Sequence, residues 1–231
     1  MFVTTALSLL VFGAAATLED PDLPSPVVEA LSASVDDGHR DNWRFRMSIS
    51  TGEGQLVGDF DGAQAQGQQW TLISPAEDAL DENLRAIWED VIDPSEDEDE
   101  GSGLFFSTTD FDYEPGTMSL IEAAGGLSHF AFTPIIAAND MDFSEHLTGV
   151  LTISDDPARV HEVRIFAEDS FKPNFAVRIN AFEIRQIYTQ IDGLPAPVMT
   201  RSVQQFEASA AFQTMEQAVE IEFSDIEYLA Q

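Results

Sequence analysis

The sequence predicts an α+β protein built on a curled antiparallel β-sheet, or half-barrel, covered by a few helices. In the second half of the chain, residues 163–165, 206–210 and 219–223 alternate apolar with polar side chains, which is the period of half-buried strands. Two long candidate strands change phase partway along, as bent or bulged strands do when a sheet wraps. A sheet of this kind buries one face against another layer or a ligand. The pattern therefore favours binding in a concavity over catalysis.

The N-terminal residues predict export. Residues 3–16 form an uncharged apolar run that closes in small side chains, so residues 1–16 are expected to be a signal peptide cleaved near Ala16. The run is too short to span a membrane, and a buried N-terminal helix is the alternative. Residues 17–24 are predicted to be an extended lead, and residues 25–231 a single domain. The expected location is periplasmic or secreted.

The first half of that domain is predicted to contain a helix, a meander and a second helix. Ser25-Pro26 offers a helix start, and the short helix runs through Leu31. Residues 43–73 contain alternating runs separated by glycine turns, which predicts a three-stranded meander. Ser74 and Glu77 have the spacing of a capping box, so a helix should start there and cover 76–92. Its apolar positions form one stripe: Leu80, Leu84, Ile87, Trp88 and Val91.

The rest of the chain is predicted to contain an acidic loop, a region without a clear pattern and five long strands. Residues 93–103 are acidic without an apolar anchor, which predicts a loop. In 104–146, residues 104–106 could be a buried strand and 119–124 a short helix. Long strands are then expected at 147–153, 160–167, 175–189, 198–213 and 216–228, separated by proline- or glycine-bearing turns.

Composition excludes several classes of function. A net charge of −32 would repel nucleic acid and anionic membrane surfaces. We interpret it first as a solubility or high-salt adaptation of the whole surface, with contact to a basic partner protein as the minority interpretation. The absence of cysteine excludes disulfides, thiol catalysis and thiolate metal sites.

No catalytic or metal-binding motif stands out, so we expect no enzyme, no metal and no cofactor. The four histidines are His39, His129, His146 and His161, and none has the spacing of a zinc motif. Ser128 beside His129 follows Gly126 but lacks the second glycine of a nucleophile elbow, since Phe130 stands at that position. The acidic residues of 97–100 and 59–62 lack the complete spacing of a calcium-binding loop.

The order of elements resembles the periplasmic lipoprotein-localisation fold of the LolA and LolB carriers. The resemblance rests on Trp43-Arg44-Phe45, on residues 149–153 and on residues 171–175 leading into long strands. It covers roughly residues 25–228, and it implies an unclosed barrel that holds acyl chains in an apolar cavity. Arg44 and Arg46 are the candidates for a basic residue in that cavity. The candidate lining residues are Phe45, Met47, Trp70, Leu84, Trp88, Phe182 and Ile184.

Two functions remain open. The leading hypothesis is an exported, non-enzymatic, monomeric protein that binds a lipid or a lipidated protein. The alternative is an interaction or structural domain of the cell envelope, with a self-packed core and an acidic surface that meets a basic envelope protein. The predicted helix at 76–92 distinguishes the two functions, because it is a movable lid in the first case and part of the core in the second.

Overall fold

The computed structural model describes residues 20, 22–34, 40–92, 104–107, 112–138, 141–210 and 213–229. The predicted signal peptide 1–16, most of the lead 17–24 and the acidic loop 93–103 lie outside the described residues. The helices are α1 (Ser25–Leu31) and α2 (Glu82–Ile92), and the strands are β1 (Trp43–Thr51), β2 (Gln55–Asp61), β3 (Trp70–Ser74), β4 (Ser119–Ala124), β5 (Leu127–Phe132), β6 (Ala137–Ala138), β7 (Met141–Asp142), β8 (Thr148–Asp155), β9 (Ala158–Phe166), β10 (Val177–Thr189), β11 (Val198–Ala210) and β12 (Gln213–Tyr228). Short 3₁₀ turns occur at Arg40–Asn42, Glu77–Ala79 and Ser144–His146.

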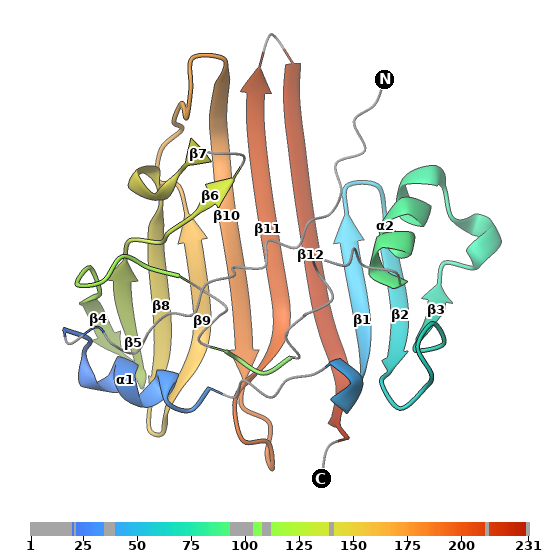
Figure 1. The fold of residues 1–231 in the computed structure, drawn as a ribbon, viewed down its shortest axis with the longest axis horizontal. Helices are drawn as coiled ribbons and strands as arrows, with labels where there is room; N and C mark the ends of the chain where they lie inside the picture. Colours follow the sequence, from blue (N-terminus) through green and yellow to red (C-terminus); the bar gives the residue numbers. More distant parts are fainter. Residues whose placement is uncertain are drawn as a thin grey trace.

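Within the described residues, ten strands form one antiparallel sheet in the order β3-β2-β1-β12-β11-β10-β9-β8-β5-β4 (Figure 1). Strands next to each other in sequence pair within each half of this sheet, while β5 pairs with β8 past the separate β6–β7 pair, and β12 returns to pair with β1. That pairing joins the N-terminal meander to the C-terminal one. The end strands β3 and β4 do not meet, so the sheet is open. The predicted antiparallel sheet with few helices is therefore confirmed.

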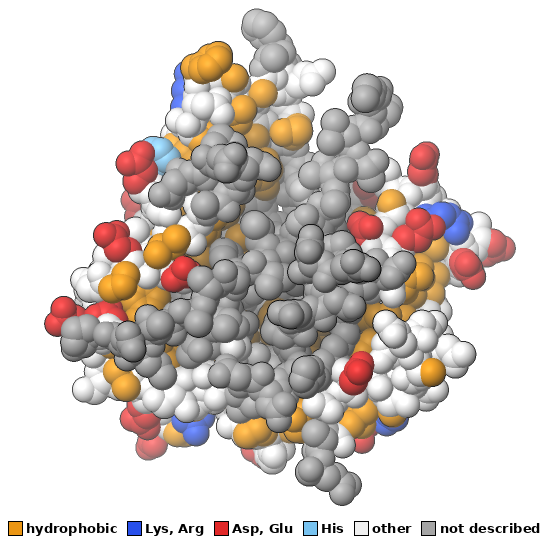
Figure 2. All heavy atoms as spheres, viewed as in Figure 1, with side chains coloured by type: hydrophobic (Ala, Val, Ile, Leu, Met, Phe, Trp, Pro, Cys, Tyr) orange, Lys and Arg blue, Asp and Glu red, His pale blue; other side chains and the backbone are white. Residues whose placement is uncertain are grey.

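Both helices lie against the same face of the sheet, which we call the inner face. Helix α1 contacts β8 and β9, and α2 contacts β2, so the two helices cover opposite halves of this face (Figure 1). Strand β1 shows why the faces differ: Trp43, Phe45 and Met47 are buried on the inner face, while Arg44 and Arg46 alternate with them. The outer face is the polar one. Viewed from the inner side, acidic side chains gather toward both lateral edges of the molecule (Figure 2).

The buried apolar side chains form two separate clusters, one beneath each helix. The α1 cluster comprises Val27, Ala30, Leu31, Phe106, Tyr113, Met118, Phe130, Phe132, Ile136, Leu147, Leu151, Ile153, Ala158, Val160, Val163, Ile165, Phe171, Ile179, Tyr188 and Ala208. The α2 cluster comprises Trp43, Phe45, Met47, Ile49, Leu56, Phe60, Leu80, Leu84, Trp88, Leu104, Phe105, Ala196, Val198, Val219 and Ile221. One sheet therefore supports two cores.

The predicted phase changes in β10 and β12 correspond to bulges. In β10 the register against β11 shifts between Ile179 and Ala181 and again near Tyr188. In β12 the shift lies opposite Arg44 and Arg46 of β1, where Asp225 has a positive φ of 52°. Each bulge moves subsequent side chains to the other face and increases the local twist. The five predicted long strands appear as β8 to β12.

Two local predictions were wrong. The helix predicted at Ser119–Ala124 is strand β4, because the glycines at 125 and 126, with φ of 65° and 82°, turn the chain into an antiparallel pair with β5. A turn with two positive φ values suits a two-residue hairpin and outweighs weak helix propensity. The second helix does not start at the Ser74 capping box, since Ser74 ends β3. Its first turn is capped by Asp81, whose Oδ1 accepts a hydrogen bond from the Leu84 N–H at 2.8 Å.

Candidate functional site

The inner face is the candidate site, and one half of it is an aromatic layer beneath α2. Phe45 stacks on Phe60 with ring centroids 5.0 Å apart. Trp70 meets Phe60 at 4.9 Å and Trp88 of α2 at 5.9 Å. Five of the seven predicted lining residues lie in or against this α2 cluster: Phe45, Met47, Trp70, Leu84 and Trp88.

Helix α2 packs closely against β2 and the turn before it at two glycines, Gly58 in the strand and Gly54 in the turn. A Cβ atom at Gly58 would lie 2.7 Å from the Trp88 ring, and one at Gly54 would lie 3.2 Å from Leu84. Trp88 is 9% exposed and Leu84 is 7% exposed. The absence of side chains at these two positions lets the helix approach the strand closely. In this structure α2 is therefore packed as core.

The structure does not bring Phe182 and Ile184 to the aromatic layer. Both lie on β10, which is separated from β1 by β12 and β11. Phe182 is half-buried against the α1 cluster and stands opposite Phe206 of β11 in register. Ile184 is 5% exposed. The predicted lining set is thus divided between the two halves of the inner face.

A polar seam, formed by Gln186, Ser202 and Gln204, runs between the two halves and was missed by the sequence analysis. In the β10–β11 register, Gln186 stands opposite Ser202, and Ile184 opposite Gln204. The Tyr188 hydroxyl donates to Oε1 of Gln186 at 3.4 Å. Ser202 is 5% exposed and faces Ile221 of β12. The only signal in the sequence is that the apolar alternation of β11 lapses at these positions.

Residues 104–107 pack on the inner face at one end of the seam. Phe106 donates its N–H to the Pro197 carbonyl at 2.9 Å, and the Met199 N–H donates to Leu104 at 2.7 Å. Phe105 contacts the Trp43 ring at 4.6 Å, and Phe106 contacts the Tyr188 ring at 5.2 Å. This segment was a possible buried strand, and Phe105 does bridge to Val198. It joins the two clusters where β11 begins.

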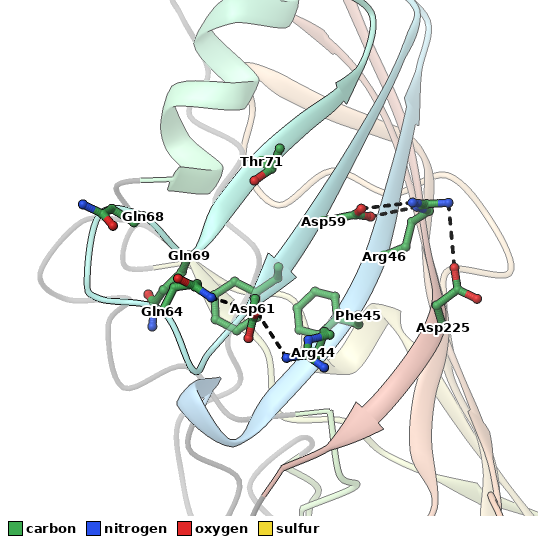
Figure 3. A pocket seen from close by; sticks show the side chains of 11 residues that line it. Arg44, Phe45, Arg46, Asp59, Asp61, Gln64, Gln68, Gln69, Thr71 and Asp225 are labelled. Carbon is green, nitrogen blue, oxygen red and sulfur yellow. Dashed lines mark hydrogen bonds and ion pairs between the residues drawn. The ribbon is translucent and has the colours of Figure 1, made fainter.

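The outer face carries a polar hollow of about 480 Å³ over β1, β2 and β12 (Figure 3). The prediction that Arg44 and Arg46 contribute to an apolar cavity is wrong, because both line this hollow on the opposite face. Arg46 binds the two carboxylate oxygens of Asp59 at 2.7 and 3.0 Å. Arg44 reaches Asp61 at 3.3 Å and Glu227 at 2.8 Å. The strand alternation of β1 fixes this orientation.

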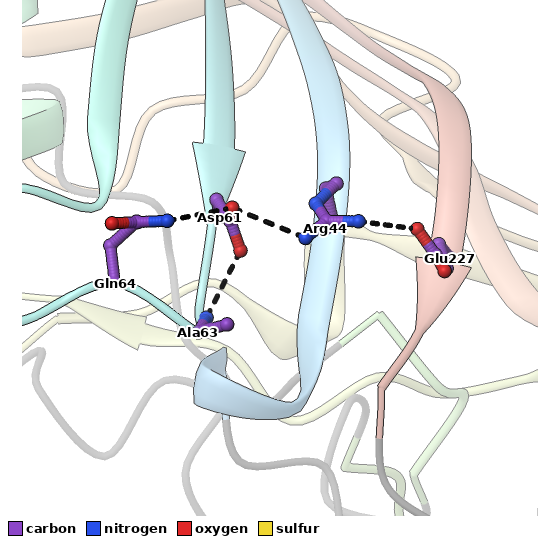
Figure 4. A network of polar contacts seen from close by, with 5 residues as sticks. All are labelled: Arg44, Asp61, Ala63, Gln64 and Glu227. Atoms are coloured by element: carbon purple, nitrogen blue, oxygen red, sulfur yellow. Dashed lines mark hydrogen bonds and ion pairs between the residues drawn. The ribbon is translucent and has the colours of Figure 1, made fainter.

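These contacts shift the pKa values of the groups involved. The hydrogen bond from Gln64 lowers the pKa of Asp61, and the Ala63 N–H and Arg44 act in the same direction (Figure 4). Hydrogen bonding to Asp61 raises the pKa of Arg44, and hydrogen bonding to Asp59 raises that of Arg46. The ionised forms are therefore mutually stabilised. These ion pairs link β1 to β2 and to β12, and the charged groups are paired with one another.

The titratable residues considered for catalysis are held in structural contacts. Ser128 donates to Oδ1 of Asp155 at 2.7 Å, and Nδ1 of His129 lies 3.0 Å from the Thr152 hydroxyl. The His146 ring stacks on Phe171. In the part of the chain that the structure describes, no group of three or more His, Cys, Asp or Glu residues is placed to hold a metal ion. The acidic residues at 97–100 lie outside the described residues.

The fold and the site define a class: an open antiparallel sheet whose apolar face is covered by helices. Searches against protein-family models, curated proteins and solved structures found no match to this chain. Among the described residues, no helix combines the length and the apolar character needed to cross a bilayer. The resemblance to the lipoprotein-localisation fold therefore stays a prediction.

Proposed function

We propose that this protein is an exported, non-enzymatic binder of a hydrophobic ligand, either a lipid or the acyl chain of a lipidated protein. The observation that supports this most directly is the half-buried pair Phe182 and Phe206, which faces inward on β10 and β11 beside the polar seam. These rings lie in the interior of β10 and β11, away from residues 104–107, which pack where β11 begins. Such an apolar surface with a few convergent polar groups is typical of ligand sites.

The seam gives the proposed ligand a polar contact as well as an apolar one. An acyl chain would lie against Phe182, Ile184 and Phe206, where burial of apolar surface supplies the driving force. The amide groups of Gln186 and Gln204 offer hydrogen-bond donors and acceptors to an ester or amide of the ligand. Tyr188 already engages Oε1 of Gln186, which leaves the amide NH₂ of that residue as the donor toward a ligand. The resemblance to the LolA and LolB carriers favours the same class of ligand.

Native mass spectrometry of protein purified from its host without detergent, with lipid extraction, tests the proposal first. A co-purifying lipid is the expected result. Titration with a fluorescent fatty acid then compares Phe206→Ala with Phe166→Ala, a matched control. Phe166 is a half-buried phenylalanine that packs under Arg164, on the outer face. Losing one buried phenyl contact should weaken binding by roughly tenfold or more for Phe206→Ala only.

The second function is an envelope interaction domain with a self-packed core, and the close fit of Trp88 on Gly58 favours it. The acidic surface, with a net charge of −32, would then meet a basic partner protein. A protein mass without bound lipid, together with no change in Trp88 fluorescence on addition of fatty acids or lipopeptides, would favour this function. Equal fatty-acid binding by the Phe206→Ala and Phe166→Ala variants would count against the proposed inner-face site.

A further inference from the structure

The loop between β9 and β10 carries a fully exposed aromatic side chain on an ordered turn. Phe171 and Ile179 exchange two backbone hydrogen bonds, of 3.0 and 2.9 Å, which close the base of the loop. At its tip, Oδ1 of Asn174 accepts from the N–H groups of Ala176 and Val177 at 2.9 and 3.0 Å. Phe175 is 99% exposed. The turn therefore presents this ring to the surroundings instead of folding it into either cluster.

The same loop places positive charge beside the ring. Lys172, the single lysine of the chain, and Arg178 line a hollow of about 300 Å³ together with Phe175 and the end of β11. Among the residues that the structure describes, no carboxylate lines this hollow, although Glu168 and Asp169 precede it in the sequence. Arg178 donates to the Ser170 hydroxyl at 2.9 Å. This differs from the outer-face hollow, where three carboxylates accompany two arginines.

Among the described residues, the cations of the tip have no carboxylate partner, whereas Arg85 and Arg159, which also lack one, donate to backbone carbonyl oxygens. Arg44, Arg46, Arg164, Arg185 and Arg201 all form ion pairs with Asp or Glu. Neither Lys172 nor Arg178 forms an ion pair within the described ranges. In a chain with 42 acidic and 10 basic residues, two such cations around an exposed ring make a distinct basic and apolar patch. Figure 2 shows apolar side chains beside a basic one at the β10 end of the molecule.

We propose that this tip docks the protein on a bilayer surface that contains anionic lipids. The Phe175 ring would insert at the boundary between headgroups and acyl chains, where aromatic side chains are favoured. Lys172 and Arg178 would bind lipid phosphates, with the guanidinium able to contact two oxygens. The acidic remainder of the surface is repelled by the same membrane, so only this end can approach it. Docking adds to the proposed function and does not require a ligand on the inner face.

Co-sedimentation with lipid vesicles tests this docking. The full chain is mixed with vesicles of phosphatidylcholine plus phosphatidylglycerol, or of phosphatidylcholine alone, and binding to the mixed vesicles only is expected. Phe175→Ser should weaken that binding by about tenfold or more. Replacing both Lys172 and Arg178 by Gln should weaken it by about fivefold for each charge. All three side chains are exposed, and melting curves check that the variants remain folded.

Matched controls lie far from the tip. Leu120→Ser removes another exposed apolar side chain, 57% exposed on the edge strand β4. Arg159→Gln removes a cation at the opposite end of β9. Both should bind like the unchanged protein. Equal binding by the tip variants and the controls, or no binding to mixed vesicles, would overturn the proposal. The fatty-acid titration is run on the same variants, so that failure of docking is distinguished from failure of inner-face binding.

Discussion

Replacing Gly58 with alanine tests whether α2 belongs to the core or moves as a cover. The new Cβ would lie 2.7 and 2.8 Å from two carbon atoms of the Trp88 ring. Carbon atoms in favourable contact are about 3.5–4.0 Å apart, so the ring would have to withdraw by roughly 1 Å. Trp88 is 9% exposed, and its ring is also in contact with Trp70. Overpacking of a filled core costs about 1–3 kcal/mol, and we expect a loss of stability in that range.

Urea unfolding followed by tryptophan fluorescence measures this loss. Gly52→Ala is the matched control, because a Cβ at Gly52 meets nothing within 4 Å and the substitution reports only the backbone effect of replacing glycine. We expect Gly58→Ala to lower the unfolding midpoint relative to Gly52→Ala, with an unchanged m value. Both variants retain all three tryptophans, so the fluorescence signal is comparable.

A double-mutant cycle with Trp88→Leu identifies the contact responsible. If the alanine methyl acts through the indole ring, Gly58→Ala should lose most of its effect when Trp88 is already replaced by the smaller side chain. An equal loss of stability in both backgrounds would refute this reasoning. The reasoning would also be refuted if Gly58→Ala had the same urea unfolding midpoint as the Gly52→Ala control. In that case α2 would move away from β2 at little cost in free energy, as a movable lid does.

Three further outcomes follow from charge and hydrogen bonding. The pKa of Asp61 is lowered from 3.8, first by the Gln64 hydrogen bond. A carboxyl whose pKa is lower in the folded state contributes stability that is present above the unfolded pKa and is lost as pH falls through the folded pKa. Asp61→Asn should therefore flatten the acid side of a profile of unfolding free energy against pH, measured below pH about 4. An unchanged slope would contradict this. The net charge of −32 should make the melting temperature rise with added salt, which screens self-repulsion, and a flat salt series would show that the carboxylates do not destabilise the fold. Asp20 is 8% exposed and accepts from the Gly116 N–H at 2.8 Å, so Asp20→Ala should cost about 1–3 kcal/mol in urea unfolding, and Asp20→Asn, which keeps an acceptor oxygen, should cost less.

The strands could be predicted because their signal is local. Alternation in β1 and in β8 to β12 arises because one face of the sheet is buried. This period of two residues can be recognised in the sequence without knowing which strands pair. The strand β4 was missed because its leucine, glutamate and alanines suit a helix as well, and only the following Gly-Gly turn distinguishes the two. The start of α2 was misplaced because Ser74 is used by the β2–β3 pair, a contact that no local motif reveals.

The candidate site was harder to predict, since it depends on register and on which strands are neighbours. Phe45 and Phe182 both face inward, as expected, yet β12 and β11 lie between their strands. That separation arises from the pairing of β12 with β1, residues distant in sequence. The outward orientation of Arg44 was implicit in the alternation of β1. The resemblance to a lipid carrier made it a candidate for the cavity, in conflict with that alternation.

The polar seam bears on the choice between the two functions. Polar side chains in an apolar layer lower stability unless hydrogen bonds compensate for lost water, so a face that only packs on itself is better filled by aliphatic residues. Gln186, Ser202 and Gln204 nevertheless occupy inward positions at the centre of the sheet, between two clusters that are filled with aliphatic and aromatic side chains. A ligand with both an acyl chain and a polar linkage would use this combination of Phe182, Phe206 and the seam. The α2 half, with Trp88 fitted against Gly58, would then serve as the rigid support of the site, and binding would be concentrated on β10 and β11.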